Sequence, residues 1–284
     1  MINVLQAMEA TAARGAEGLT AAAREALCGA LQALQRDDGG FAGLDGRSDP
    51  YFTLFAWFCL RALGVPYDRD NLCAYMAAHR HATRAIDAQC AALLLACESR
   101  TVRDTSYGVI VLSLMRGDTR GVYASFLRCL AARKVPRWMA RVAWWGQQDL
   151  FQSDRAARLP TPRLAAGLVL ATLAGASAPG MRVALKERQC AGGGFASASG
   201  AQADLLATAV TRFALGCVAE TEQVQHPDAT RERDLAFIEA CWLDDGLFGA
   251  SPTAVQGDAE HTFYGLLALG TCRPLRKGEE SDIR

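Results

Sequence analysis

The chain has 284 residues, of which 51% are hydrophobic, so it can bury one sizeable core. Its 30 Lys and Arg residues balance its 30 Asp and Glu residues, which excludes the basic field that attracts nucleic acid or anionic membranes. The apolar stretches are shorter than the roughly 20 residues of a membrane span, so we expect no transmembrane segment and no nucleic-acid partner.

The cysteines indicate the compartment. None of the ten forms a CxxC pair, and most lie in apolar runs, such as Cys59, Cys129 and Cys217. Unpaired cysteine behaves as a small hydrophobic residue, and free thiols are typical of a reducing compartment. The start of the chain, MINVLQAMEATAARGAEG, carries acids and lacks the apolar core of a secretory signal. We therefore expect buried free thiols and a cytoplasmic location.

Two kinds of helix alternate along the chain. Residues 20–36 are predicted to form an amphipathic helix with Leu27, Leu31 and Leu34 on one stripe. Residues 37–64 combine a glycine-rich turn with a helix that is apolar on nearly every face, and such a helix must be buried all round. Residues 71–79 and 234–242 are similar to the first, outward-facing kind.

The turn and buried helix of residues 37–64 recur at residues 189–216 and 242–270. The glycine supplies a positive φ and the aspartate can cap the helix that follows. Three matches at five positions indicate stacked supersecondary units. The aligned positions are Gly39, Gly193 and Gly246; Phe41, Phe195 and Phe248; Asp49, Asp204 and Asp258; Thr53, Thr208 and Thr262; and Gly64, Gly216 and Gly270.

Weaker copies of the unit fill the middle of the chain. Asp87 precedes an apolar helix, and residues 121–132 and 161–175 are candidates for two more. Buried helices then start near residues 50, 87, 121, 161, 204 and 259. Six helical hairpins with inner and outer helices predict an all-α fold, an α/α toroid, over residues 1–272. The polar tail, residues 273–284, is expected to be disordered. Residues 104–115 can also be read as an inner helix, which would break the even spacing.

The motifs resemble those of the prenyltransferase and squalene-cyclase repeat superfamily. The QxxxGxF starts at Gln35 and Gln189 are similar to the QW motif of triterpene cyclases, with Phe in place of Trp. The segment GDAEHTFYGLLALG resembles the zinc-site helix of protein prenyltransferase β subunits. The single toroid is also similar to the β domain of class II terpene cyclases. The resemblance implies a central aromatic-lined cavity that holds an isoprenoid chain.

Aromatic side chains are the candidates for contacting this substrate, since their π faces stabilise carbocations. Ordinary core packing is the alternative role for each of them. The resemblance also implies a diphosphate site, and the few suitably placed bases are Arg47 in the first turn and two arginines near the tryptophans. The substrate-binding candidates are Tyr51, Phe55, Trp144, Trp145, Tyr264, Glu260, Arg47, Arg137 and Arg141.

The family's zinc site is only partly present. Its Asp and His positions correspond to Asp204 and His261, but Leu206 stands where the zinc-binding Cys would be. Asp258 or Glu260 can replace the missing ligand, so zinc and magnesium both stay open as cofactors. Losing the thiolate removes the soft anionic ligand that also activates a thiol substrate.

The catalytic candidates are the repeat acids Asp49, Asp204 and Asp258, together with His261. Inner-helix starts should bring them to one end of the toroid, although helix capping alone also explains the acids. The repeat does not require His261, because the equivalent residues are Phe52 and Ala207.

Three functions follow from these candidates. The first is an enzyme that cyclises or transfers an isoprenoid. The second is a non-catalytic toroid that binds a lipid or protein partner. The third is a different acid–base chemistry in the same cavity, with Asp258, Glu260 and His261 as acid and base. The acidic string at residues 68–71 is the nearest to the DxDD acid of protonating cyclases, but its position is typical of an N-cap.

Overall fold

Helices dominate the computed structural model, which describes residues 4–98, 137–151, 153–156, 158–222 and 228–273. The described strands are the antiparallel pair β1 (Phe195–Ala196) and β2 (Ala203–Asp204). The all-α expectation is therefore confirmed. Within these ranges no helix combines the length and apolar character needed to cross a bilayer. The segments 104–115 and 121–132 and the tail from residue 274 lie outside the described residues.

The buried helices begin where the repeat predicts them. The helices are α1 (Val4–Glu17), α2 (Ala21–Leu34), α3 (Pro50–Leu63), α4 (Arg69–Ala78), α5 (Ala85–Glu98), α8 (Arg137–Trp145), the 3-10 helix η1 (Gln148–Phe151), α9 (Ser153–Ala156), α10 (Thr161–Ala174), α11 (Pro179–Lys186), α12 (Leu205–Glu222), α13 (Asp228–Ala240) and α14 (Ala259–Thr271). The starts of α3, α5, α10, α12 and α14 each fall within two residues of a predicted start. The remaining predicted start, near residue 121, lies outside the described residues.

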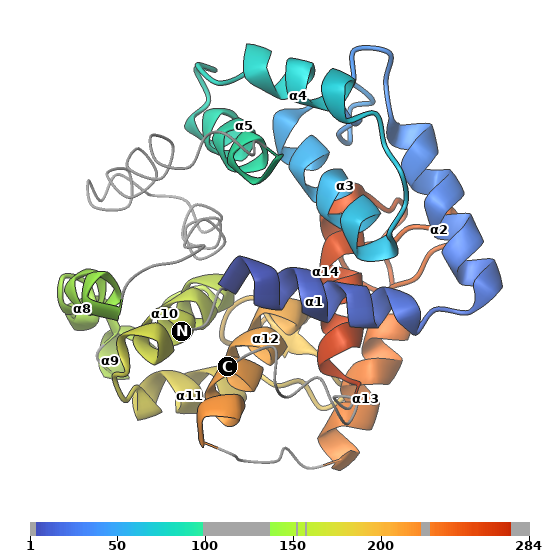
Figure 1. Cartoon of the computed structure of the whole chain (residues 1–284). Helices are drawn as coiled ribbons and strands as arrows, with labels where there is room; N and C mark the ends of the chain where they lie inside the picture. Colours follow the sequence, from blue (N-terminus) through green and yellow to red (C-terminus); the bar gives the residue numbers. More distant parts are fainter. Residues whose placement is uncertain (1–3, 99–136, 152, 157, 223–227, 274–284) are drawn as a thin grey trace.

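The apolar helices pack side by side in a continuous series. In this series α5, α3, α14, α12, α10 and α8 each contact the next (Figure 1). A second set of helices packs on this series: α4 contacts α5, α2 contacts α3, α13 contacts α14, and α11 contacts α10. In Figure 1, α2, α4 and α13 lie on the outer side of the series. The buried residues of α2 are Leu27 and Leu31, as its amphipathic stripe predicts.

Helix α1 is an element that the sequence did not lead us to expect. It packs against α14 and α3, and its residues Val4, Leu5 and Met8 are buried. The contact with α14 has no room for side chains at two glycines. A Cβ atom added to Gly15 would lie 1.9 Å from the Leu266 carbonyl oxygen, and α14 approaches α1 equally closely at its own C-terminal end. The two helices therefore meet backbone against backbone.

The three repeated turns share the same hydrogen bonds. In each, the repeat threonine accepts the backbone N–H of the repeat phenylalanine, at 2.8 Å from Phe41 to Thr53, 2.9 Å from Phe195 to Thr208, and 3.2 Å from Phe248 to Thr262. All three threonines are fully buried. The repeat glycines have φ of 87°, 95° and 81°, which is the left-handed region that the turn requires. In each repeat, the glycine-containing loop is therefore hydrogen-bonded to the first turn of the buried helix that follows it.

We expect Thr208→Val to destabilise the protein by about 1–3 kcal/mol, because the buried N–H of Phe195 loses its acceptor while the side-chain shape is kept. Thr172→Val is the matched control, since the Thr172 hydroxyl only donates to the Leu168 carbonyl within α10. Urea unfolding of the two variants measures the difference. Equal losses would show that the shared hydrogen bond does not hold the turn.

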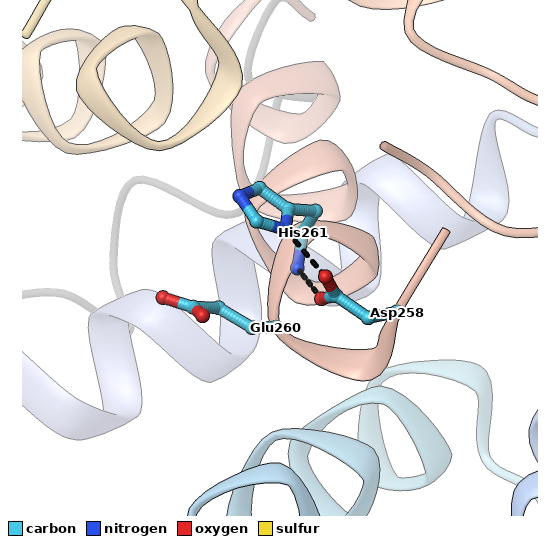
Figure 2. A group of neighbouring side chains, drawn as sticks. All are labelled: Asp258, Glu260 and His261. Atoms are coloured by element: carbon cyan, nitrogen blue, oxygen red, sulfur yellow. Dashed lines mark hydrogen bonds and ion pairs between the residues drawn. The ribbon is translucent and has the colours of Figure 1, made fainter. Parts of the chain in front are cut away.

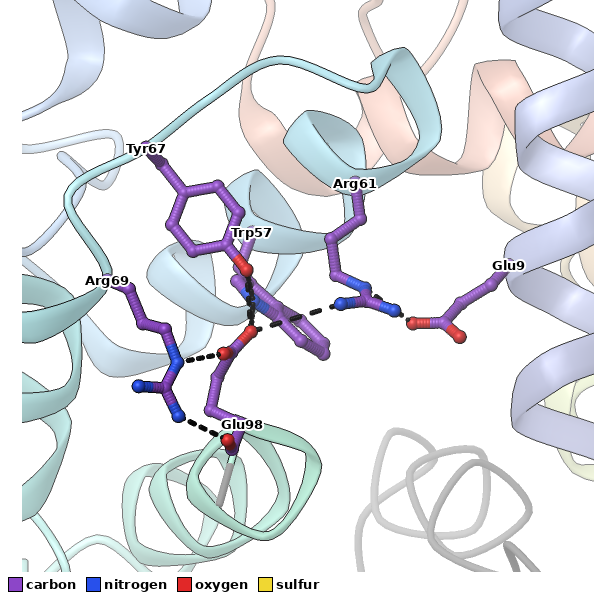
Figure 3. A network of polar contacts seen from close by, with 6 residues as sticks. All are labelled: Glu9, Trp57, Arg61, Tyr67, Arg69 and Glu98. Atoms are coloured by element: carbon purple, nitrogen blue, oxygen red, sulfur yellow. Dashed lines mark hydrogen bonds and ion pairs between the residues drawn. The ribbon is translucent and has the colours of Figure 1, made fainter. Parts of the chain in front are cut away.

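Glu98 joins several elements at the end of α5. Its carboxylate accepts hydrogen bonds from Trp57 Nε1 at 2.7 Å, Tyr67 OH at 2.6 Å and Arg69 Nε at 2.7 Å (Figure 3). Burial would raise the pKa of Glu98, but the hydrogen bonds from Tyr67, Arg69 and Trp57 outweigh it and hold the pKa below its ordinary value. Arg61 lies 3.9 Å from the same carboxylate and pairs with Glu9 of α1 at 2.9 Å. The network connects α1, α3, α4 and α5.

Glu98→Gln should cost about 2 kcal/mol of unfolding free energy, because charge-assisted hydrogen bonds become neutral ones. The contribution of a carboxylate with a lowered pKa is present above its unfolded pKa and is lost as pH falls through the folded pKa. The difference between wild type and variant should therefore shrink in acid. Glu239→Gln, at an exposed glutamate of α13, is the control and should change stability little.

Candidate functional site

In the described part of the chain, the first turn of α14 carries a close group of one histidine and two carboxylates, Asp258, Glu260 and His261. Asp258 is the N-cap, with an extended backbone, and its Oδ1 accepts the backbone N–H of His261 at 2.8 Å. This cap fixes the start of α14, so Glu260 and His261 are held on its first turn. Asp258 and Glu260 are buried, with exposures of 6% and 7%. The helix start therefore concentrates three ligating or proton-carrying groups.

Asp258 also orients the imidazole of His261. Its Oδ2 lies 2.8 Å from His261 Nδ1, while Oδ1 makes the cap (Figure 2). The Nε2 edge points away from Asp258 in Figure 2, and the His261 side chain is 19% exposed. One carboxylate thus serves both as a helix cap and as the partner of a histidine whose second nitrogen is directed elsewhere.

Glu260 is hydrogen-bonded to a second buried helix, α3. The Tyr51 hydroxyl of α3 donates to Glu260 Oε1 at 2.6 Å, although the residues are 209 positions apart. Behind this contact the Phe55 ring lies 4.9 Å from Tyr51 and 5.5 Å from Tyr264, measured between ring centroids. The carboxyl group therefore has one strong hydrogen-bond donor and an apolar aromatic wall.

These surroundings shift the pKa values of Glu260 and His261. Burial raises the pKa of Glu260 to about 7, against the lowering effects of Tyr51 and His261. For His261, burial opposes protonation, but Asp258, through its hydrogen bond and charge, with Glu260 and Asp204, outweighs it and raises the pKa. Both shifts favour protonation, which gives a neutral carboxyl at Glu260 and a charged imidazole at His261.

The two other repeat acids cap their helices in the same way. Asp204 Oδ1 accepts the Ala207 N–H at 2.7 Å, and Asp49 Oδ1 accepts the Tyr51 N–H at 2.8 Å. Burial raises the pKa of Asp204, and this residue interacts electrostatically with His261. The structure therefore brings Asp204, Asp258 and His261 near one another, while Asp49 adjoins the site through Tyr51.

Two of the aromatic candidates lie in the core. Phe55 is fully buried and Tyr264 is 1% exposed, and both pack in the aromatic cluster of α3 and α14. Trp144 stacks on Phe151 with ring centroids 5.8 Å apart, whereas Trp145 is 75% exposed. Among these five residues, Tyr51 donates a hydrogen bond to Glu260 of the group on α14.

The two arginine candidates with described side chains, Arg47 and Arg141, make no described contact with the group on α14. Arg141 Nε donates to the Ala174 carbonyl at 3.2 Å, at the C-terminal end of α10, and Arg47 is exposed in the first turn. Arg137 begins α8, and its side chain lies outside the described residues. A base that the sequence did not single out, Arg84, instead pairs with Asp49 at 3.1 Å and Asp87 at 3.5 Å. Its position three residues before Asp87 is the one local signal that would have found it.

Three residues of this site could hold a metal ion together, namely Asp258, Glu260 and His261. Ligand atoms of Asp258, Glu260 and His261 all lie within 4.8 Å of one another. Two carboxylates and an imidazole suit a hard or borderline cation. The Cys59 thiol lies 3.7 Å from the Ala259 carbonyl oxygen, and burial raises its pKa well above the usual range, which disfavours the thiolate. Leu206, at the family's Cys position, offers no ligand.

Comparison with known proteins adds no assignment. The chain matches none of the family sequence profiles with which it was compared, and no curated protein sequence matches it. The function must therefore be argued from the site.

Glu260→Gln should remove a pH dependence of stability. The pKa of this carboxyl is 4.5 in the unfolded chain and about 7 in the folded protein. As pH rises between these two values, the unfolded chain loses its proton while the folded protein keeps it, so the free energy of unfolding falls. Between about pH 4.5 and pH 8, wild type should lose about 3 kcal/mol relative to the variant. Urea unfolding at the two pH values measures this loss, with exposed Glu239→Gln as control. Parallel pH profiles would contradict the shifted carboxyl.

Proposed function

We propose that this protein is an enzyme that protonates and cyclises an isoprenoid substrate inside an α/α toroid. The observation that carries the proposal is the buried carboxyl of Glu260, which binds the Tyr51 hydroxyl, lies against aromatic rings and has a pKa of about 7. A carboxyl group that stays protonated near neutral pH, and is poor in water contacts, is suited to donate a proton to an apolar substrate.

The packing of the helices supports the proposed toroid. Each of α5, α3, α14, α12 and α10 contacts the next in the series, and the outer helices contact them from the other side. The acids at the starts of α3, α12 and α14 then face a common end, as the repeat predicts. Helices α3 and α14 are apolar on nearly every face, which is the character that the wall of an isoprenoid site requires.

The proposed step uses both oxygens of Glu260. Tyr51 donates to Oε1, so Oε2 is the oxygen that carries the proton. The π electrons of a substrate double bond take this proton and leave a carbocation, which a second double bond attacks to close a ring. Loss of a proton from carbon to the Glu260 carboxylate forms a new double bond and restores the acid. The reaction is an isomerisation and needs no co-reactant.

His261 is proposed to exchange protons between Glu260 and solvent. Its imidazole is held by Asp258, lies within the same 4.8 Å group and keeps partial exposure. A raised pKa favours the charged imidazole, which can return a proton to Glu260 when one is lost to water. The residue is thus a relay, and the carbon-protonating acid is Glu260.

Prenyl transfer is less well supported than cyclisation. Transfer as in the resembled family needs a zinc thiolate and basic residues for diphosphate, and neither Leu206 nor Arg141 supplies them. The lack of a thiolate at Leu206 and the use of Arg141 at the end of α10 favour the second candidate, a non-catalytic toroid that binds a lipid or a protein partner. In that case the ionisable group of α14 would only cap and connect helices.

Incubation with farnesyl and geranylgeranyl diphosphates and the corresponding alcohols, followed by gas chromatography of extracted products, tests the proposal. Wild type should convert one of them to a cyclic isomer, and Glu260→Gln should lower kcat by about 100-fold or more while retaining substrate binding. His261→Ala should slow turnover less at acidic pH than at neutral pH.

Glu239→Gln is the matched control, because Glu239 is an exposed glutamate on α13. Binding of a substrate by wild type and Glu260→Gln alike, with no product from either, would support the non-catalytic toroid. Equal turnover by wild type and Glu260→Gln would rule out Glu260 as the acid.

A further inference from the structure

A second polar cluster lies at the N-terminal ends of α3 and α5. Arg84 joins its two acids, since NH1 lies 3.1 Å from Asp49 Oδ2 and Nε lies 3.5 Å from Asp87 Oδ2. Asp49 uses its other oxygen to cap α3. The cluster is built from different residues than the group on α14, and the reaction proposed for Glu260 does not use it.

Two buried polar atoms in this cluster lack partners. Asp87 Oδ1 and the Tyr75 hydroxyl have no hydrogen-bond partner in the described part of the chain, and both residues are 7% exposed. The Tyr75 hydroxyl interacts electrostatically with Asp38 and then with Asp49 and Asp87. It lies next to the Thr53 hydroxyl, which accepts the N–H of Phe41 and donates to the Asp49 carbonyl. Buried polar atoms of this kind are normally satisfied by a ligand, water or ion.

Arg84 cannot satisfy this cluster fully. Its side chain is 63% exposed, and its two contacts reach only the Oδ2 atoms of Asp49 and Asp87. Exposed ion pairs of this type contribute little. The two carboxylates of Asp49 and Asp87 carry more negative charge than the one guanidinium of Arg84 neutralises. The excess charge lies beside Asp87 Oδ1, which has no hydrogen-bond partner in the described residues.

We propose that Asp49 and Asp87 bind a hydrated divalent cation of the Mg²⁺ or Mn²⁺ type, and that Arg84 competes with this ion for Asp49 Oδ2. Such ions are held by one or two carboxylates and keep several of their waters. Asp87 Oδ1 and Asp49 Oδ2 are the ligand atoms, and the Tyr75 hydroxyl bonds a metal-bound water. The bound ion supplies the missing positive charge and partners both unsatisfied atoms.

Titration of the full chain with Mn²⁺, followed by the electron paramagnetic resonance signal of free Mn²⁺, tests this site. Arg84→Ala should bind Mn²⁺ about two- to fivefold more tightly than wild type, since the competing weak ion pairs are gone. Asp87→Asn should lose this binding. Asp70→Asn, at an exposed acid of α4, should match wild type.

His261→Ala separates the two ionisable groups of the protein. The proposal expects this variant to bind Mn²⁺ as wild type does, because His261 belongs to the group on α14. Binding that is lost in His261→Ala and kept in Asp87→Asn would assign the ion to Asp258, Glu260 and His261 instead. No binding by either wild type or Arg84→Ala at millimolar Mn²⁺ would also overturn the proposal. Arg84 is exposed, so its variant keeps the test decisive even if Asp87→Asn folds poorly.

Discussion

Each buried helix in this chain begins with backbone N–H groups that must find acceptors away from water, and the rest of the structure depends on how they do so. Asp49, Asp204 and Asp258 accept them at the starts of α3, α12 and α14. The threonine four residues later accepts the N–H of the preceding turn's phenylalanine. Because cap and turn are fixed together, an entirely apolar helix can be buried without leaving its polar end unsatisfied.

The candidate site is a variation on this repeated cap. In all three repeats one carboxylate oxygen is used by the backbone, and the second oxygen is available for other contacts. In the first repeat that oxygen pairs with Arg84, and in the last it holds His261. The residue three positions after the aspartate is Phe52, Ala207 or His261, so a change at one helix position converts a structural cap into an acid–histidine pair. The aspartate cap is the same in all three repeats, and the chemistry at each cap depends on the residues that contact its second oxygen.

The sequence correctly predicts the structural features that depend on residues close together in the chain. Helix starts follow from caps and apolar periodicity, both of which are read within a few residues, so α3, α10 and α14 begin where expected. Helix α1 was missed because its packing depends on Gly15 meeting α14, a contact between segments about 250 residues apart that leaves no local pattern. The bond between Tyr51 and Glu260 was missed for the same reason, although both residues were candidates.

Position in the sequence proved a poor guide to which way side chains point. Trp144 and Trp145 are adjacent, yet one stacks on Phe151 and the other is largely exposed, because consecutive helical residues face different directions. The nearby Arg141 donates to the Ala174 carbonyl at the C-terminal end of α10. A cluster of suitable residue types therefore predicts a site only when a repeat or a cap also fixes their direction, as it does for Asp258 and His261.

Burying several carboxylates near one another has a high electrostatic cost, and the protein offsets it differently for each. Asp258 receives a helix N-terminus and a histidine, and Asp49 receives a helix N-terminus and Arg84. Glu260 has neither a cap nor an arginine among its described contacts. The Tyr51 hydroxyl and the charge of His261 do not outweigh the cost of its burial, so its pKa rises to about 7. The carboxyl that the scaffold leaves least compensated is thus the one that retains a proton. This is the physical reason for placing the acid of the proposed reaction at Glu260 and not at the repeat aspartates.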